Sequence, residues 1–211
     1  MRSSPKTPHP VHLGLSILIL LLATVASWAA NEDIGSIQYN STIGAYEIKT
    51  VQNLHDLAYY VRGILTSGVP ANNAKGKTFK MTTNINTTFS SSCASILPIG
   101  TSSYPFKGTF DGQGYTLGFI CIDRSLENNV GLFGYLEEGT VKNLKLYGAK
   151  VNGKDTVGGI VGYNKGTISN CSLDSSTITG KNFVGGITGY NNKVLEYSTV
   201  NNLDRSQAPI I

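Results

Sequence analysis

Charged residues are scarce in this 211-residue chain, where they make up only 14% of the sequence. The 17 basic residues barely outnumber the 13 acidic ones, which leaves a formal net charge of +4. Domains that bind nucleic acid usually display clustered lysine and arginine. The composition therefore gives no reason to expect a nucleic-acid partner.

Residues that carry catalysis are also few. His55 is the only histidine after residue 30, and it falls in a helical pattern, so we expect a solvent-facing or partly packed side chain. No H-E-x-x-H zinc motif or calcium-binding nonapeptide repeat occurs. A glycan-cleaving β-helix needs paired carboxylates or an acidic metal cluster, but Asp111, Asp123, Asp155 and Asp174 fall in different phases of the chain. We expect no catalytic residue, metal or cofactor.

Long apolar runs are limited to one segment near the start. Arg2 and Lys6 precede an apolar run from Leu13 to Ala26, and small residues follow it. This pattern predicts a secretory signal peptide over residues 1–29, cleaved after Ala29. An uncleaved anchor is the alternative, because residues 13–30 are just long enough to span a membrane. Either way, the chain is expected to be secreted or displayed at the cell surface.

Cysteine occurs only three times. In an exported protein, three cysteines allow one disulfide and leave one thiol over. Cys93 and Cys121 are the candidates for the disulfide, which would tie a loop to the first coil of the fold. Cys171 is then expected to be a buried small hydrophobic side chain.

One segment has helical periodicity. Apolar residues at three- and four-residue spacings between Thr50 and Leu65 predict an amphipathic helix, with Thr50 as its N-cap and Gly68 and Pro70 ending it. A short strand, Tyr46 to Ile48, precedes the helix. We interpret residues 30–75 as a strand-helix cap.

The rest of the chain contains a repeat. The stretches VGLFGY, VGGIVGY and VGGITGY begin at Val130, Val157 and Val184, which are 27 residues apart. A fixed period of this length is typical of repeat architectures. Short apolar runs ended by Gly, Asn, Asp or Ser indicate strands and turns from Thr78 onward. We assign three 27-residue repeats to residues 130–202.

Stacking explains the repeat, because a unit of about three short strands cannot bury a core alone. Successive coils at the usual strand spacing would place equivalent side chains in columns, with glycines at the corners and Asn143 stacked on Asn170. The sequence therefore predicts an all-β parallel β-solenoid with a single N-terminal capping helix. The expected columns are Val130, Val157 and Val184; Val141, Ile168 and Leu195; and Leu146, Leu173 and Val200.

The ends of the repeat region are less regular. Residues 76–129 are expected to form irregular first coils, in which Thr116 to Ile122 aligns with the segment beginning at Thr140, an offset of 24 residues that implies a shorter coil. This alignment points Cys121 outward, and Cys171 falls in the inward column of Leu144. Residues 203–211 form a tail too short for another coil. We expect either a longer reading frame or edge-to-edge assembly through the C-terminal coil.

The repeat stretches resemble the GLUG-motif repeats of bacterial surface adhesins and of the N-terminal regions of IgA-specific metallopeptidases. Leu97 to Leu117 is similar to the segment that precedes those repeats, although the usual Trp before "PIG" is absent and the usual "DIDL" reads "NINT" from Asn84. The resemblance extends from about Tyr46 to Asn202. It implies a parallel β-solenoid outside a cell, with a role in adhesion or as a spacer, and it implies no chemistry by itself.

Three tyrosines form the candidate binding site. Tyr135, Tyr163 and Tyr190 close the repeats in matching phase. If they point outward, they would form a ladder for sugar rings or apolar side chains; otherwise they cover the corner of the coil and pack on the glycine layer. The predicted function is a non-enzymatic adhesion, binding or spacer module, whose partner is an unknown host or matrix glycan or protein. The alternatives are a carbohydrate-active β-helix enzyme and a fragment of a larger surface metallopeptidase.

Overall fold

The computed structural model describes residues 33–64, 73–87 and 96–204 of the 211-residue chain. The predicted signal peptide, Cys93 and the tail after Asp204 lie outside the described residues. Within the described part, no helix is both long enough and apolar enough to cross a membrane.

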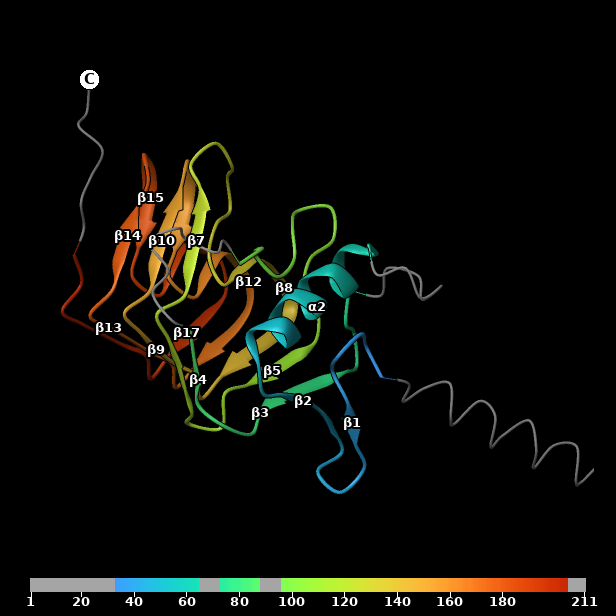
Figure 1. Ribbon diagram of the computed structural model, residues 1–211. Coiled ribbons are helices and arrows are strands. Elements are labelled where there is room, and N and C mark those ends of the chain that lie inside the picture. Colours follow the sequence, from blue (N-terminus) through green and yellow to red (C-terminus); the bar gives the residue numbers. More distant parts are fainter. Residues whose placement is uncertain (1–32, 65–72, 88–95, 205–211) are drawn as a thin grey trace, which may run out of the picture. The chain divides into compact units, whose positions relative to one another are not determined.

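The described strands wind into a parallel β-solenoid, as predicted (Figure 1). They form four sheets, and every strand pair is parallel except the first, in which β1 runs antiparallel to β2. The largest sheet contains β1 (Tyr39–Asn40), β2 (Ala45–Ile48), β3 (Thr78–Met81), β5 (Thr109–Asp111), β8 (Phe133–Lys142), β12 (Val161–Ser169), β16 (Thr188–Asn191) and β17 (Val194–Glu196).

The other three sheets form the remaining sides of the coils. One contains β4 (Ile85–Asn86), β6 (Thr116–Gly118), β9 (Lys145–Tyr147), β13 (Ser172–Asp174) and β18 (Thr199–Asn201). Another contains β7 (Cys121–Arg124), β10 (Lys150–Gly153) and β14 (Thr177–Thr179), and the last pairs β11 (Asp155–Gly158) with β15 (Asn182–Gly185). The coil from β11 to β14 therefore gives one strand to each sheet, one more than the approximate three that we expected.

The core consists of side chains stacked in columns, and the predicted columns are confirmed. Val157 pairs with Val130 and Val184, and its side chain is fully buried. Two longer columns extend toward the N-terminus beyond the repeats. They are Tyr46, Phe79, Phe110, Val141, Ile168 and Leu195, and Ile85, Leu117, Leu146, Leu173 and Val200. Full burial of one such side chain stabilises a fold by roughly 1.5–3 kcal/mol, so these columns account for much of the stability.

The predicted alignment of the first regular coil is wrong. Thr116 pairs with Lys145 rather than Thr140, and Thr109 takes the place opposite Thr140. The coil is therefore longer than a repeat. A turn around Gln113, which has a positive φ of 52°, supplies part of the added length, because Phe110 and Leu117 pair with Val141 and Leu146 although they lie seven rather than five residues apart. Such a turn gives no periodic apolar signal, which is why the pattern missed it.

A β-bulge keeps the repeats in phase. Between β8 and β12 the register shifts after Lys165, because β8 has one more residue than β12 in this stretch. Glu138 lies at the bulge with a positive φ of 58°. The VGLFGY stretch is one residue shorter than VGGIVGY, and the extra residue of β8 at the bulge compensates for the difference. Tyr163 therefore pairs with Tyr135 before the bulge, and Thr167 pairs with Thr140 after it.

The single described helix, α2 (Val51–Arg62), connects β2 to β3 at the N-terminal end of the coil stack (Figure 1). Thr50 is its N-cap, as predicted, and forms a capping box with Asn53. The helix ends earlier than Leu65, because Gly63 adopts the left-handed conformation that ends many helices. Gly68 and Pro70, which were expected to end it, lie outside the described residues.

The glycine before each repeat tyrosine lets adjacent coils approach closely. A Cβ added at Gly162 would lie 2.5 Å from the carbonyl carbon of Asn129, and one at Gly189 would lie 2.5 Å from the amide nitrogen of Val157. Both contacts are with backbone of the preceding coil, so a side chain could be accommodated only if the coils separated. This explains why the motif retains glycine at this position.

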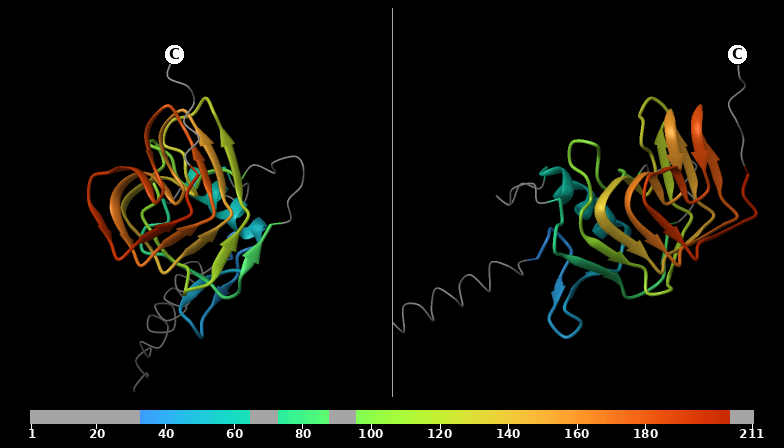
Figure 2. Two further views of the ribbon diagram at one scale, coloured as in Figure 1. Left: turned by 90° about the vertical axis from the view of Figure 1, so that its left-hand side faces the viewer. Right: turned by 180° about the vertical axis from the view of Figure 1, so that it is seen from behind.

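The last described coil lies at one end of the coil stack (Figure 2). It exposes side chains that belong to the core columns. Leu195 and Val200 are each 39% exposed, whereas Ile168 and Leu173, one coil earlier in the same columns, are 0% exposed. No further described strand covers this coil.

Candidate functional site

The predicted tyrosine column is present on the largest sheet. Tyr135, Tyr163 and Tyr190 lie in register on β8, β12 and β16. The rings of Tyr135 and Tyr163 are parallel within 3°, with centroids 4.8 Å apart, and Tyr190 stacks on Tyr163 at the same spacing with an angle of 24°. The spacing equals the distance between neighbouring strands, so strand pairing alone produces the stack.

The stack is partly accessible, but the faces of its middle ring, Tyr163, are not. Tyr135 and Tyr163 are half-buried, and Tyr190 is exposed. Each face of Tyr163 is covered by a neighbouring ring, and the edge contact of Phe183 adds a fourth ring beside Tyr190. A ligand could therefore meet the ring edge of Tyr163 rather than its faces. Ligand binding by the tyrosines stays a prediction.

Charged side chains lie beside the stack. The Lys165 Nζ is 5.6 Å from the ring centroids of both Tyr135 and Tyr163, within cation–π range. A hydrogen bond with Tyr135, helped by the charge of Glu137, raises the pKa of Lys165. Glu137 forms an ion pair of 2.7 Å with Lys107, and the hydrogen bond from that lysine lowers the pKa of Glu137. We call Tyr135, Tyr163, Tyr190, Lys165 and Glu137 the tyrosine ribbon.

The predicted asparagine stack is confirmed and extends one coil further. Asn170 Nδ2 donates to Asn143 Oδ1 at 2.8 Å, and Asn143 Nδ2 donates to Asp111 Oδ1 at 2.9 Å. Burial alone would raise the pKa of Asp111, but the hydrogen bonds from Asn143 and Gln113 outweigh it and lower this pKa. Asp111 is therefore an ionised acceptor at the start of an amide ladder.

The other aspartates that we considered for catalysis also accept amide hydrogen bonds. Asp123, Asp155 and Asp174 receive side-chain amides at 2.9, 2.6 and 3.1 Å from Asn152, Asn182 and Asn202, respectively. In each case the donor lies one coil further along the chain. These contacts give the carboxylates a role in joining coils.

Two of the cysteines lie in the described part. Cys171 is free, as expected, and buried in the core, and its burial raises the pKa of the thiol to about 11. Cys121 is disulfide-bonded. Because Cys93 lies outside the described residues, the Cys93–Cys121 pairing stays a prediction.

Neither His55 nor a cluster of metal ligands forms a further candidate site among the described residues. His55 is half-buried on α2, in agreement with a structural position. In the described ranges, no three His, Cys, Asp or Glu side chains come together in a way that could hold a metal ion.

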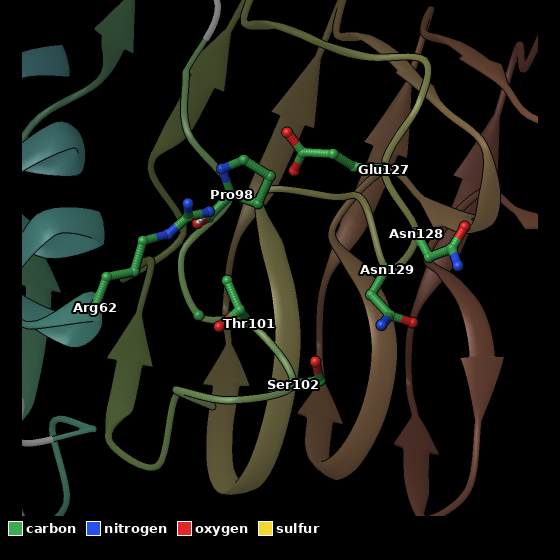
Figure 3. Close-up of a pocket in the computed structure, with 8 residues that line it drawn as sticks. Arg62, Pro98, Thr101, Ser102, Glu127, Asn128 and Asn129 are labelled. Atoms are coloured by element: carbon green, nitrogen blue, oxygen red, sulfur yellow. Dashed lines mark hydrogen bonds between the residues drawn. The ribbon is translucent and has the colours of Figure 1, made fainter.

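A small cavity, which the sequence patterns did not indicate, lies between α2 and two loops (Figure 3). Its volume is about 260 Å³. It is lined by Arg62, Pro98, Gly100, Thr101, Ser102, Glu127, Asn128 and Asn129. These residues come from three separate segments outside the regular repeats, so no spacing in the sequence could have connected them.

Comparison with known proteins identifies the repeat. The GLUG motif matches residues 155–179, the coil from β11 to β14. The chain contains a GLUG repeat. This confirms the resemblance seen in the sequence, although the matched span covers only one of the three coils, and it leaves the adhesin or metallopeptidase type open.

The chain is also similar to a much larger protein. Over 61 residues, or 28% of this chain, it is 46% identical to halomucin from Haloquadratum walsbyi. The chain spans about 1% of the length of that relative. No solved structure gives a significant match.

Proposed function

We propose that this GLUG-repeat chain is a surface or secreted β-solenoid that acts as a non-enzymatic adhesion or binding module. The tyrosine ribbon carries the proposal, because three aromatic rings and a lysine are held in register on an outer side of the coils. The hydroxyl-bearing ring edges and the adjacent charges suit hydrogen bonding to a glycan or to a polar protein surface. The similarity to a protein named halomucin supports a location outside the cell.

The enzyme alternative is less well supported by the geometry. The carboxylates considered for glycan cleavage each accept an amide from a neighbouring coil, which ties them to coil packing. A role as the spacer region of a larger surface metallopeptidase is compatible with the same solenoid, since a spacer needs no ligand.

Binding of the purified chain to a glycan array and to immobilised matrix proteins tests the proposal. We expect binding that is lost in the double variant Tyr163→Ala with Tyr190→Ala. The matched control is Tyr115→Ala with Tyr197→Ala, which removes two exposed tyrosines outside the stack and should leave binding unchanged. Equal binding by both double variants would reject the tyrosine ribbon as the site. Depolymerisation of a polysaccharide by the pure chain would instead favour the enzyme.

A further inference from the structure

Arg62 has an incomplete set of partners. It is half-buried at the C-terminal end of α2, and its Nη2 donates to the carbonyl oxygen of Pro98 at 2.8 Å. Its Nε is buried and has no hydrogen-bond partner. Among the described residues, no carboxylate lies within 4.0 Å of its guanidinium. Burial is unfavourable for the charged guanidinium and lowers the pKa of Arg62, and the opposite charge of Glu127 offsets only part of this effect.

The size and the polar side chains of the cavity beside Arg62 suit a small anion that carries several hydroxyl groups. The cavity beside it, about 260 Å³, is smaller than pockets for drug-sized ligands. The hydroxyls of Thr101 and Ser102 and the amides of Asn128 and Asn129 line the cavity and can both donate and accept hydrogen bonds. Figure 3 shows these side chains arranged around the space between Arg62 and the loop that holds Asn129.

The acidic residue in the lining limits the charge that a ligand can carry. Glu127 is exposed at the cavity and lies 3.8 Å from Arg124 Nε, so that arginine neutralises it only in part. A doubly charged phosphate would be repelled by the remaining negative charge. A single carboxylate can pair with the guanidinium at one side, while Glu127 accepts hydrogen bonds from sugar hydroxyls.

We propose that this cavity binds a carboxylate-bearing sugar, with Arg62 pairing the carboxylate. Thr101, Ser102 and the two asparagines bind the sugar hydroxyls. Two sources can supply this ligand: a free uronic acid, or a uronic acid at the end of a glycan. The site does not use the tyrosine ribbon and stands independently of the proposed function.

Titration of the 15N-labelled full chain with sodium glucuronate tests the proposal by NMR. We expect shifts confined to the amides of Arg62, residues 100–102 and residues 127–129. Glucose, which lacks the carboxylate, should bind at least 10-fold more weakly. A glucuronate-terminated trisaccharide distinguishes the sources: tighter binding than free glucuronate indicates a glycan end, and weaker binding indicates the free acid.

Variants separate the role of the arginine from general charge. Arg62→Gln should weaken glucuronate binding at least 10-fold, whereas Lys193→Gln, which removes an equal charge from an exposed position in the last coil, should not change it. Asn128→Asp adds a negative charge at an exposed lining position without altering α2. It should weaken the binding of glucuronate more than that of glucose, because only glucuronate carries a charge that the added carboxylate repels, and this keeps the test valid if Arg62→Gln does not fold.

Three results would overturn the proposal: equal binding of glucose and glucuronate, unchanged binding by both cavity variants, or shifts that map to other coils. The proposed function fails separately, through the tyrosine variants on the array.

Discussion

Asn170 meets two structural requirements at one residue. Its φ is 51°, a left-handed conformation that asparagine tolerates better than most residues, and its side chain donates to Asn143. Replacement by alanine should remove the hydrogen bond and add backbone strain. We expect Asn170→Ala to lower the free energy of unfolding by about 1.5–3 kcal/mol in urea denaturation.

Asn170→Gly is the informative control, because glycine accepts the positive φ but lacks the amide. We expect it to lose less stability than the alanine variant. An alanine variant as stable as the wild type would show that the ladder contributes nothing.

The Cys171 thiol should make stability depend on pH in the alkaline range. Its pKa rises from the ordinary 9.0 to about 11 on folding, because it is buried. Between these values the folded state keeps a proton that the unfolded state loses, so the free energy of unfolding should fall as pH rises from 9 to 11. The slope contributed by this group is at most about 1.4 kcal/mol per pH unit.

Urea denaturation at several pH values measures this slope, and Cys171→Ala should reduce it. An unchanged slope in the variant would assign the pH dependence to other groups. Rapid reaction of Cys171 with maleimide in the native protein would contradict its burial.

At the scale of the elements, an inner strand and a terminal strand share a column but differ in burial. Ile168 in β12 is 0% exposed, and Leu195 in β17, directly over it, is 39% exposed. We expect Ile168→Ala to cost about 2–5 kcal/mol and Leu195→Ala clearly less, because little cavity forms at an open end. Urea denaturation measures both. Equal losses would mean that another part of the chain covers β17.

The sequence predicted those elements whose partners repeat at a fixed interval. The equivalent positions in consecutive coils are Val130, Val157 and Val184, so the repeat interval alone predicts that these residues are neighbours. Helix α2 was predicted for a similar reason, since its apolar residues follow the helical period. Its end was misplaced because Gly63, a C-cap, lies inside a stretch that continues the periodic pattern as far as Leu65.

Other elements could not be predicted because their positions depend on turns and on distant segments. The pairing of Thr116 with Lys145 depends on the turn around Gln113, whose conformation is not encoded in an apolar pattern. The Arg62 cavity is formed by segments at least 25 residues apart that share no repeat. The tyrosine column was predicted, but the sequence did not show that the neighbouring rings would stack closely enough to cover both faces of Tyr163.

At the scale of the whole molecule, edge-to-edge assembly through the C-terminal coil stays a prediction. Leu195 and Val200 are partly exposed core residues on strands with a neighbour on one side only among the described strands. We expect concentration-dependent self-association in sedimentation velocity, abolished by Leu195→Lys with Val200→Lys. A chain that remains monomeric at high concentration would contradict this prediction.

The solenoid depends on side chains one repeat apart lying over each other in consecutive coils. Methyl NOE spectroscopy of the folded chain tests it most directly. Stacked coils should give NOEs from the methyls of Val157 to those of both Val130 and Val184, and from Ile168 to both Val141 and Leu195. Val157 methyls with NOEs only to residues nearby in the sequence, or to non-equivalent positions of other repeats, would contradict the solenoid.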